Sequence, residues 1–180
     1  MSGDIMKKKI LSTAAFVCVV AGCASSPDQE QASASAILEP RSGSSVQGKV
    51  TFTQTGPDIV RVSGTISGHS KGPKGFHIHD KGDCSDAKGM STGGHFNPGG
   101  HKHGGPYASE RHSGDLGNLN FDANGVATFS FVVGDISVSS DREDGIIGRA
   151  VIVHATVDDQ KTDPTGNAGG RVACGIIKPL

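Results

Sequence analysis

The chain contains no tryptophan and a single tyrosine, and only 4% of its 180 residues are aromatic. It also lacks an excess of charge of either sign. Its 17 basic and 18 acidic residues leave a net charge of −1, so nothing in the composition indicates a nucleic-acid partner. Glycine is abundant instead, at 27 residues, which is typical of a protein with many turns and long loops. The length suits one ordinary domain with a tail.

A convincing amphipathic helix is absent as well. Apolar and polar residues alternate with a two-residue period in residues 46–54 and 59–67, as they do in half-buried strands. Asn124 and Gly125 lie between β-forming residues within the segment 119–133, a pattern that predicts a β-hairpin.

Further short apolar segments follow at residues 145–157 and 170–180. Together the segments amount to about eight short strands, bounded by turn residues. This pattern predicts an all-β fold, either an antiparallel sandwich or a flattened barrel. Two connections, residues 80–117 and 158–169, are too long for simple turns, and long loops in a compact domain are commonly functional.

Residues 1–22 have the pattern of a secretory signal peptide. Lysines at residues 7–9 precede an apolar stretch that is short for a membrane span. The sequence VAGC at residues 20–23 resembles the processing site of bacterial lipoproteins, whose cysteine is lipidated. We therefore expect Cys23 to become a lipidated N-terminus, with an ordinary cleaved signal peptide as the alternative.

Export also sets the expected location and domain boundaries. Acyl chains on Cys23 would anchor the protein to a bilayer. By resemblance to lipoproteins, Ala24 favours the outer membrane, with the protein on the periplasmic side. Residues 23–35 are polar and rich in serine and alanine, which predicts a flexible tether. The folded domain is expected to span residues 36–180.

The four cysteines leave one possible crosslink. Cys18 departs with the signal peptide, and Cys23 is the expected lipid site. Cys84 and Cys174 then remain in an oxidising compartment, where a single intramolecular disulfide is the favoured state.

Six of the eight histidines fall within residues 75–118, a glycine-rich segment with almost no apolar periodicity. His77 and His79 are one residue apart in an extended segment, so their side chains point to the same face. His154 ends a later apolar strand. The loop between adds further donors: His95, His101, His103, His112 and Asp115.

These donor types indicate bound metal. Four histidines suit copper, whereas three histidines and an aspartate form a closed tetrahedral site suited to zinc. A glycine-rich loop cannot offset its ordering entropy by burying apolar groups, but a metal can order it, since binding free energy becomes folding free energy.

Six motifs occur in the order GFHIH, GGHFNP, KHGGP, ERHSGDLGN, GIIGRAVIVH and TGNAGGRVACG. In these motifs and their order, residues 36–177 resemble the copper/zinc superoxide dismutases. The resemblance implies an eight-stranded antiparallel Greek-key sandwich or flattened barrel of immunoglobulin-like architecture with two long functional loops. It also implies one copper and one zinc ion per subunit and an enzyme that converts superoxide to dioxygen and hydrogen peroxide.

The resemblance assigns a role to each motif. The implied copper ligands are His77, His79, His95 and His154, and the implied zinc ligands are His95, His103, His112 and Asp115. Arg171 would hold the anionic substrate, and His95 would bridge the metals and transfer a proton. Asp158 would link a copper histidine to a zinc histidine. Cys84 and Cys174 would form the family's disulfide.

The chain departs from the family at several points. His69 and His101 have no place among the implied ligands, and we expect them to be surface residues. The loop at residues 159–165 is short and lacks the acidic pair and the lysine that guide substrate in the animal enzymes. Cys84 also lies further ahead of His95 than in those enzymes. Because this mixes features of two branches, the oligomeric state stays open, with a homodimer as one possibility.

Two other functions fit parts of the sequence. A membrane-tethered module that binds or delivers copper and zinc without catalysis would keep some of the histidines. It is disfavoured because all the implied copper ligands and Arg171 are present. A purely structural adhesion domain would explain neither the ligands nor the glycine-rich loop.

Overall fold

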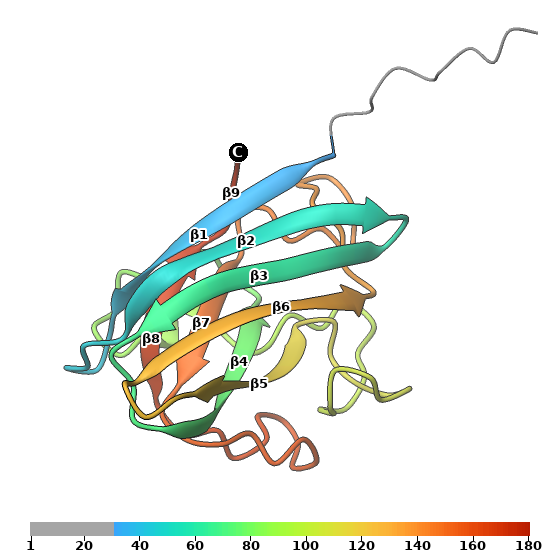
Figure 1. Cartoon of the computed structure of the whole chain (residues 1–180). Coiled ribbons are helices and arrows are strands. Elements are labelled where there is room, and N and C mark those ends of the chain that lie inside the picture. Colours follow the sequence, from blue (N-terminus) through green and yellow to red (C-terminus); the bar gives the residue numbers. More distant parts are fainter. Residues whose placement is uncertain (1–30) are drawn as a thin grey trace, which may run out of the picture.

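The computed structural model describes residues 31–180 (Figure 1). The predicted signal peptide and Cys23 lie outside these residues. The regular structure consists of β1 (Ser33–Pro40), β2 (Gln47–Gly56), β3 (Ile59–Ser67), β4 (Gly72–His79), β5 (Asp115–Phe121), β6 (Val126–Gly134), β7 (Ala150–His154), β8 (Arg171–Ile176), β9 (Lys178–Pro179) and one 3-10 turn, η1 (Met90–Thr92). Within this part of the chain no helix has the length and hydropathy needed to cross a membrane.

The strands form an antiparallel barrel flattened into two layers. Their order is β5-β4-β7-β8-β1-β2-β3-β6, and β9 pairs with β1. β1 joins the layers, because residues 33–38 pair with β2 whereas Glu39 and Pro40 pair with β8. In Figure 1, β1, β2, β3 and β6 form one layer and β8, β7, β4 and β5 lie behind it. The predicted all-β class and flattened-barrel architecture are confirmed.

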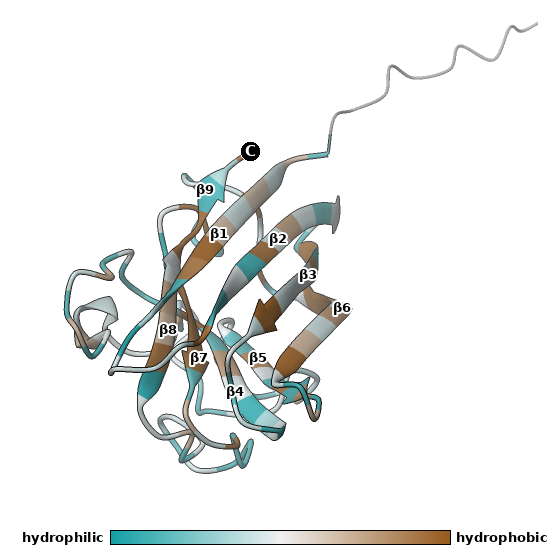
Figure 2. Cartoon of the chain, turned by 60° about the vertical axis from the view of Figure 1, so that its left-hand side comes forward, coloured by the Kyte–Doolittle hydropathy of each residue, from teal (hydrophilic) through white to brown (hydrophobic). Residues whose placement is uncertain are grey.

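The core lies between the layers and follows from two-residue periodicity. On β2, Val50 and Phe52 are fully buried, while Thr51 between them is only partly covered. The alternation of hydropathy along β2 is visible in Figure 2. From the other layer, Phe76 and Ile78 of β4 enter the same cluster. Each such side chain contributes about 1.5–3 kcal/mol of burial free energy.

The sheet begins earlier than the sequence suggested. Residues 33–35, assigned to the flexible tether, belong to β1 and pair with residues 51–53 of β2. Ala34 is fully buried, so its side chain is part of the core. The serines on either side made this segment look like a polar linker, although one alanine on the inner face is enough to continue the alternation.

The turn at Asn124 and Gly125 forms, but the predicted hairpin does not. The N–H of Gly125 donates to the carbonyl oxygen of Asp122 at 3.1 Å, and Gly125 has φ 74°. However, β5 and β6 stand at opposite ends of the strand order and share no ladder. The hairpin prediction was wrong because Asn-Gly specifies a tight reversal only. Here the reversal carries the chain from one layer to the other.

The connection between β4 and β5 is fastened to the outer face of the second layer. Cys84 forms a disulfide with Cys174 of β8, with a Cα–Cα distance of 5.9 Å across 90 residues of sequence. The predicted disulfide is therefore confirmed. Cys174 is buried with Ala150 and Ile152 of β7 in a small apolar cluster separate from the main core. The disulfide thus holds the glycine-rich loop over the strands that carry the histidines.

Candidate metal centre

β4 and β7 present histidines on the outer face of the second layer. Since Phe76 and Ile78 point into the core, His77 and His79 point the opposite way, toward the long connections. His154 ends β7, which pairs directly with β4. All three histidines are at most 2% exposed, so the covering loops exclude water from them.

Four histidines converge at this point. His95 comes from the glycine-rich loop and is joined to His79 by an isolated β-bridge. One ring nitrogen from each histidine lies within 4.8 Å of the others. We call these residues the four-histidine cluster: His77, His79, His95 and His154.

Hydrogen bonds on the far side of two rings fix which nitrogen faces the centre. Nδ1–H of His79 donates to the carbonyl oxygen of Gly93 at 3.0 Å, and Nδ1–H of His154 donates to that of Gly169 at 3.2 Å. A neutral imidazole has one donor and one acceptor, so both Nε2 atoms carry lone pairs. These atoms face each other at 3.4 Å. Two lone pairs cannot bond to each other, but a cation between them satisfies both.

Two more nitrogens of this cluster are unpaired among the described residues. They are Nδ1 of His77 and Nε2 of His95, both buried. The opposite nitrogens are engaged, by Asp158 Oδ2 at 2.8 Å and by Asp115 Oδ1 at 2.8 Å respectively. A buried acceptor without a partner costs about 1–3 kcal/mol, so four inward lone pairs are the mark of a ligand site. Four imidazoles suit copper, and these residues fit it.

A second cluster adjoins the first and shares His95. The Nδ1 atoms of His95, His103 and His112 lie 2.8, 3.1 and 3.3 Å from one oxygen, Oδ1 of Asp115. The other oxygen, Oδ2, accepts the backbone N–H groups of Gly104 at 3.1 Å and His112 at 2.9 Å, which fixes the carboxylate. Three imidazoles and one carboxylate fit a closed tetrahedral zinc site. We call His95, His103, His112 and Asp115 the aspartate cluster.

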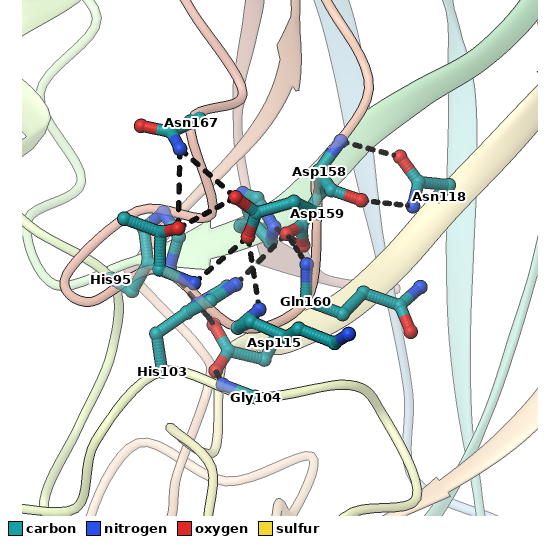
Figure 3. A network of polar contacts seen from close by, with 12 residues as sticks. His95, His103, Gly104, Asp115, Asn118, Asp158, Asp159, Gln160 and Asn167 are labelled. Atoms are coloured by element: carbon teal, nitrogen blue, oxygen red, sulfur yellow. Dashed lines mark hydrogen bonds and ion pairs between the residues drawn. The ribbon is translucent and has the colours of Figure 1, made fainter.

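Asp158 connects the two clusters from behind (Figure 3). Its Oδ2 accepts Nε2–H of His77 at 2.8 Å, and its Oδ1 accepts Nε2–H of His103 at 2.9 Å. Asn118 of β5 holds the backbone of Asp158 through two hydrogen bonds, at 2.8 and 2.9 Å. A carboxylate behind a ligating histidine fixes its tautomer and ring orientation. Asp158 therefore turns Nδ1 of both histidines toward the metal positions.

A glycine is required beside this carboxylate. Gly166 has φ 62°, and a Cβ on it would lie 1.8 Å from Oδ1 of Asp158 and 2.6 Å from Nε2 of His103. Any side chain there would displace the carboxylate. The absence of a side chain therefore lets the backbone pack directly against the shared carboxylate.

Burial and carboxylates shift the histidine pKa values in opposite directions. Burial lowers the pKa of His79 and of His154 well below the usual value, and that of His95 to about 4, so these rings are neutral. Burial also acts on His103, but its bonds to Asp115 and Asp158 outweigh it and raise the pKa of His103 to about 10. Burial would raise the pKa of Asp115, yet its histidine partners hold it well below its usual range.

Arg171 is the cation beside the four-histidine cluster. It starts β8 and pairs across the ladder with His154. Its Nη2 donates to the carbonyl oxygen of Gly93 at 2.7 Å, the same oxygen that accepts Nδ1–H of His79. The cation is thus tied to two members of the cluster, and burial lowers its pKa without discharging it.

Comparison with known proteins agrees with this geometry. Residues 46–177 match the family model described as copper/zinc superoxide dismutase (SODC). The chain belongs to the copper/zinc superoxide dismutase family. It is 45% identical over 142 residues to the copper-zinc superoxide dismutase 2 of Brassica juncea, which covers 76% of this chain and 91% of the relative. A solved structure described as the clock protein EA4 is 46% identical, with a TM-score of 0.75, and covers 83% of this chain and 96% of that one.

The structure places every residue that the family resemblance singled out within residues 31–180. The seven implied ligands form the two clusters, Asp158 joins them, and Arg171 stands beside them. His101 is exposed and belongs to neither cluster, as expected of a surface residue.

His69 differs from the expected surface residue. It is half-buried, its ring lies 5.0 Å from that of Phe121, and its Nε2–H donates to the carbonyl oxygen of His154 at 3.1 Å. The aromatic neighbour covers the ring, and the strand end of β7 offers an acceptor. Neither contact is visible from the residues around His69 in the sequence.

Two further residues of the superoxide dismutase site were not predicted. Thr92, fully buried at the end of η1, accepts a hydrogen bond from Arg171. Asp163 accepts the backbone N–H of His103 at 2.8 Å and lies 3.7 Å from Nε2 of His112. Both lie in loops without periodicity. The sequence offered only their positions as a signal: Thr92 directly precedes the GGHFNP motif, and Asp163 lies in the short loop at residues 159–165.

Proposed function

We propose that this superoxide dismutase holds copper in the four-histidine cluster and zinc in the aspartate cluster. His95 carries the assignment: its buried Nε2 has no partner among residues 31–180 and faces one cluster, while its Nδ1 faces Asp115 in the other. A single imidazole with two inward nitrogens is arranged to be shared by two cations. The reaction consumes two superoxide anions and two protons and yields dioxygen and hydrogen peroxide.

Each residue has a task in this reaction. When bound, copper supplies the one-electron acceptor and donor, and zinc supplies a fixed positive charge. Arg171 binds the superoxide anion beside the four-histidine cluster. His95 takes up a proton at Nε2 between the two half-reactions and delivers it to the second superoxide. Asp158 keeps His77 and His103 in the ligating tautomer.

Arg171 also focuses the substrate. Removal of residues 1–22 would take away three lysines and one aspartate, leaving 14 basic and 17 acidic residues and a net charge of −3. An anionic substrate approaching an acidic protein needs a local positive potential. In Arg171→Ala we expect a lower rate constant with weaker salt dependence and both metals retained. Wild-type kinetics at every ionic strength would contradict this role.

The direct test is metal content combined with activity. Purified protein should contain copper and zinc and remove superoxide, and a copper-selective chelator should abolish the removal. The alternative, a membrane-tethered module that binds or delivers metal without catalysis, predicts full loading and no activity. That result would overturn the enzymatic assignment.

We further propose that the chain is an exported lipoprotein of the bacterial type, anchored through Cys23 on the periplasmic side of the outer membrane. The support is the lysine-rich start, the apolar stretch and the VAGC box of residues 20–23. Domain boundaries follow: a signal peptide at 1–22 and a tether from residue 23. Cys23→Ser should move the protein from the membrane to the soluble exported fraction with its activity unchanged. Persistent membrane association would refute the anchor.

For the assembly we propose a homodimer. Ile37 of β1 is 60% exposed and lines a hollow of about 240 Å³ where β1 meets β8; Ile176, the disulfide, Glu39 and Lys178 complete its lining. Exposed apolar side chains rimmed by charged residues suit a subunit contact. Sedimentation of the Cys23→Ser protein should give twice the monomer mass, and Ile37→Glu should reduce it to one. A monomer in both would reject the proposal.

A further inference from the structure

We infer that Thr92 is a positioning residue for the substrate anion: its buried hydroxyl sets the orientation of the Arg171 guanidinium. The inference rests on the proposed function, which assigns the superoxide anion to Arg171. Neither the motifs nor the two clusters point to Thr92.

The hydroxyl of Thr92 has a defined direction. It donates its hydrogen to the carbonyl oxygen of Gly89 at 2.9 Å, so its lone pairs are left to accept. Nη1 of Arg171 donates to it at 2.7 Å. Thr92 is 0% exposed, so water cannot take the place of either partner. A short bond from a charged donor to a fixed, dry acceptor is among the stronger hydrogen bonds.

Three acceptors together hold one end of the guanidinium. Besides Thr92, the carbonyl oxygen of Gly89 accepts from Nη1 at 2.8 Å, and that of Gly93 accepts from Nη2 at 2.7 Å. The guanidinium has five N–H bonds. The described residues therefore accept three of them, and two stay available for an anion.

The turn that carries Thr92 also contacts the four-histidine cluster. Thr92 is the last residue of η1, and the next residue, Gly93, accepts hydrogen bonds from both Arg171 and His79. Thr92 therefore lies in the segment that fixes the anion-binding cation relative to a copper-side histidine. A freely rotating arginine would keep its charge here but lose its direction.

Hydrogen bonds to neighbouring residues hold the backbone of η1 and therefore fix the position of the Thr92 hydroxyl. Asp86 Oδ2 accepts the N–H of Met90 at 2.9 Å, and Ser91 Oγ donates to the carbonyl oxygen of Asp83 at 2.7 Å. The carbonyl oxygen of Thr92 accepts the N–H of Lys81 at 2.9 Å. These contacts leave the backbone in place when only the Thr92 hydroxyl is removed.

The test compares Thr92→Val, which removes the hydroxyl and keeps the shape, with Thr92→Ser, which keeps the hydroxyl. Thr65→Val is the matched control, because it makes the same exchange at an exposed threonine of β3 whose hydroxyl contacts that of Thr128 and not Arg171. Azide is titrated into the copper- and zinc-loaded proteins, and its affinity is read from the copper absorption spectrum. Copper content is measured alongside.

We expect Thr92→Val to bind azide about tenfold more weakly, the loss typical of one hydrogen bond to a charged group. Copper content should be unchanged, and Thr92→Ser and Thr65→Val should bind azide like the wild type. Wild-type azide affinity in Thr92→Val would overturn the inference. If Arg171→Ala also bound azide with wild-type affinity, the proposed role of Arg171 in binding the anion would be wrong. If azide affinity fell in Arg171→Ala but not in Thr92→Val, only the proposed role of Thr92 would be wrong.

Discussion

The four-histidine cluster and the aspartate cluster share the ring of His95 but differ in the partners that their buried polar atoms have. In the first, no carboxylate is present, and the inward nitrogens face one another or nothing within the described residues. In the second, three imidazoles surround one carboxylate oxygen. The first cluster therefore depends on a cation for its stability, whereas the second is held together before any metal binds by the contacts of its imidazoles with Asp115, among them the ion pair of His103.

The difference has a functional reason. A redox site would need neutral ligands, and burial lowers the pKa of the rings of the four-histidine cluster so that they stay neutral. A structural site needs ligands that stay in place, and Asp115 fixes them through both of its oxygens. Asp158 couples the two, since one oxygen serves each cluster.

The largest effect should come from breaking the four-histidine cluster alone. His154→Ala removes a donor that belongs only to that cluster, so superoxide removal should fall to the background rate. Zinc content should persist, because the aspartate cluster keeps all four of its donors. Metal analysis together with a superoxide assay checks both points. His101→Ala, an exposed histidine outside both clusters, is the control, and retained activity in His154→Ala would contradict the comparison.

Breaking the link between the clusters should have the next largest effect. In Gly166→Ala the added Cβ would meet Oδ1 of Asp158 at 1.8 Å and displace the carboxylate. Zinc affinity should fall by about 10- to 100-fold, the loss typical of a disrupted partner behind a ligand. Chelator competition measures this affinity. Gly170→Ala, where a Cβ meets nothing within 4 Å, should bind zinc normally; equal losses in both variants would argue against the role of Asp158.

The metal-free protein should reveal the two clusters through opposite pH dependences. Burial lowers the pKa of His77, His79, His95 and His154, so below about 6.5 the unfolded chain binds more protons and the free energy of unfolding falls as pH drops toward 4. The pKa of His103 is raised to about 10. Its contribution to the free energy of unfolding is therefore fully present below pH 6.5 and is lost as pH rises toward 10.

Stability of the metal-free protein should therefore peak near the ordinary histidine pKa, about 6.5. A difference of one bound proton between the unfolded and the folded chain changes the free energy of unfolding by about 1.4 kcal/mol per pH unit. Urea unfolding across the pH range measures the curve. His103→Asn should remove the fall in the free energy of unfolding above pH 6.5 and leave the fall below pH 6.5 unchanged. Loss of the fall at acidic pH instead would contradict the assignment of the alkaline side to His103.

The smallest effect should come from the edge of the aspartate cluster. Asp163→Asn keeps an oxygen for the N–H of His103 but removes the charge 3.7 Å from Nε2 of His112. We expect zinc affinity to fall about threefold, since a half-exposed charge is strongly screened. Copper affinity should not change. Glu143→Gln, an exposed acid elsewhere, controls for net charge, and a similar loss there would show that Asp163 has no local role.

The fold was largely predictable because two-residue alternation decides which side chains face the core. The same rule placed His77 and His79 together opposite Phe76 and Ile78. The hairpin at Asn124 and Gly125 was mispredicted, because turn chemistry is local whereas strand pairing depends on distant partners. The start of β1 was missed for a related reason: Ala34 becomes a core residue only once β2 lies beside it.

The sequence by itself determined the kinds of donor available, the shared face of His77 and His79, and the pairing of Cys84 with Cys174. Only the tertiary structure decided that Gly166 packs on the carboxylate of Asp158 and that Thr92 holds Arg171. The reason is physical. Alternation and residue chemistry act between neighbours, whereas loops without periodicity take their geometry from the strands, the disulfide and the polar network that hold them.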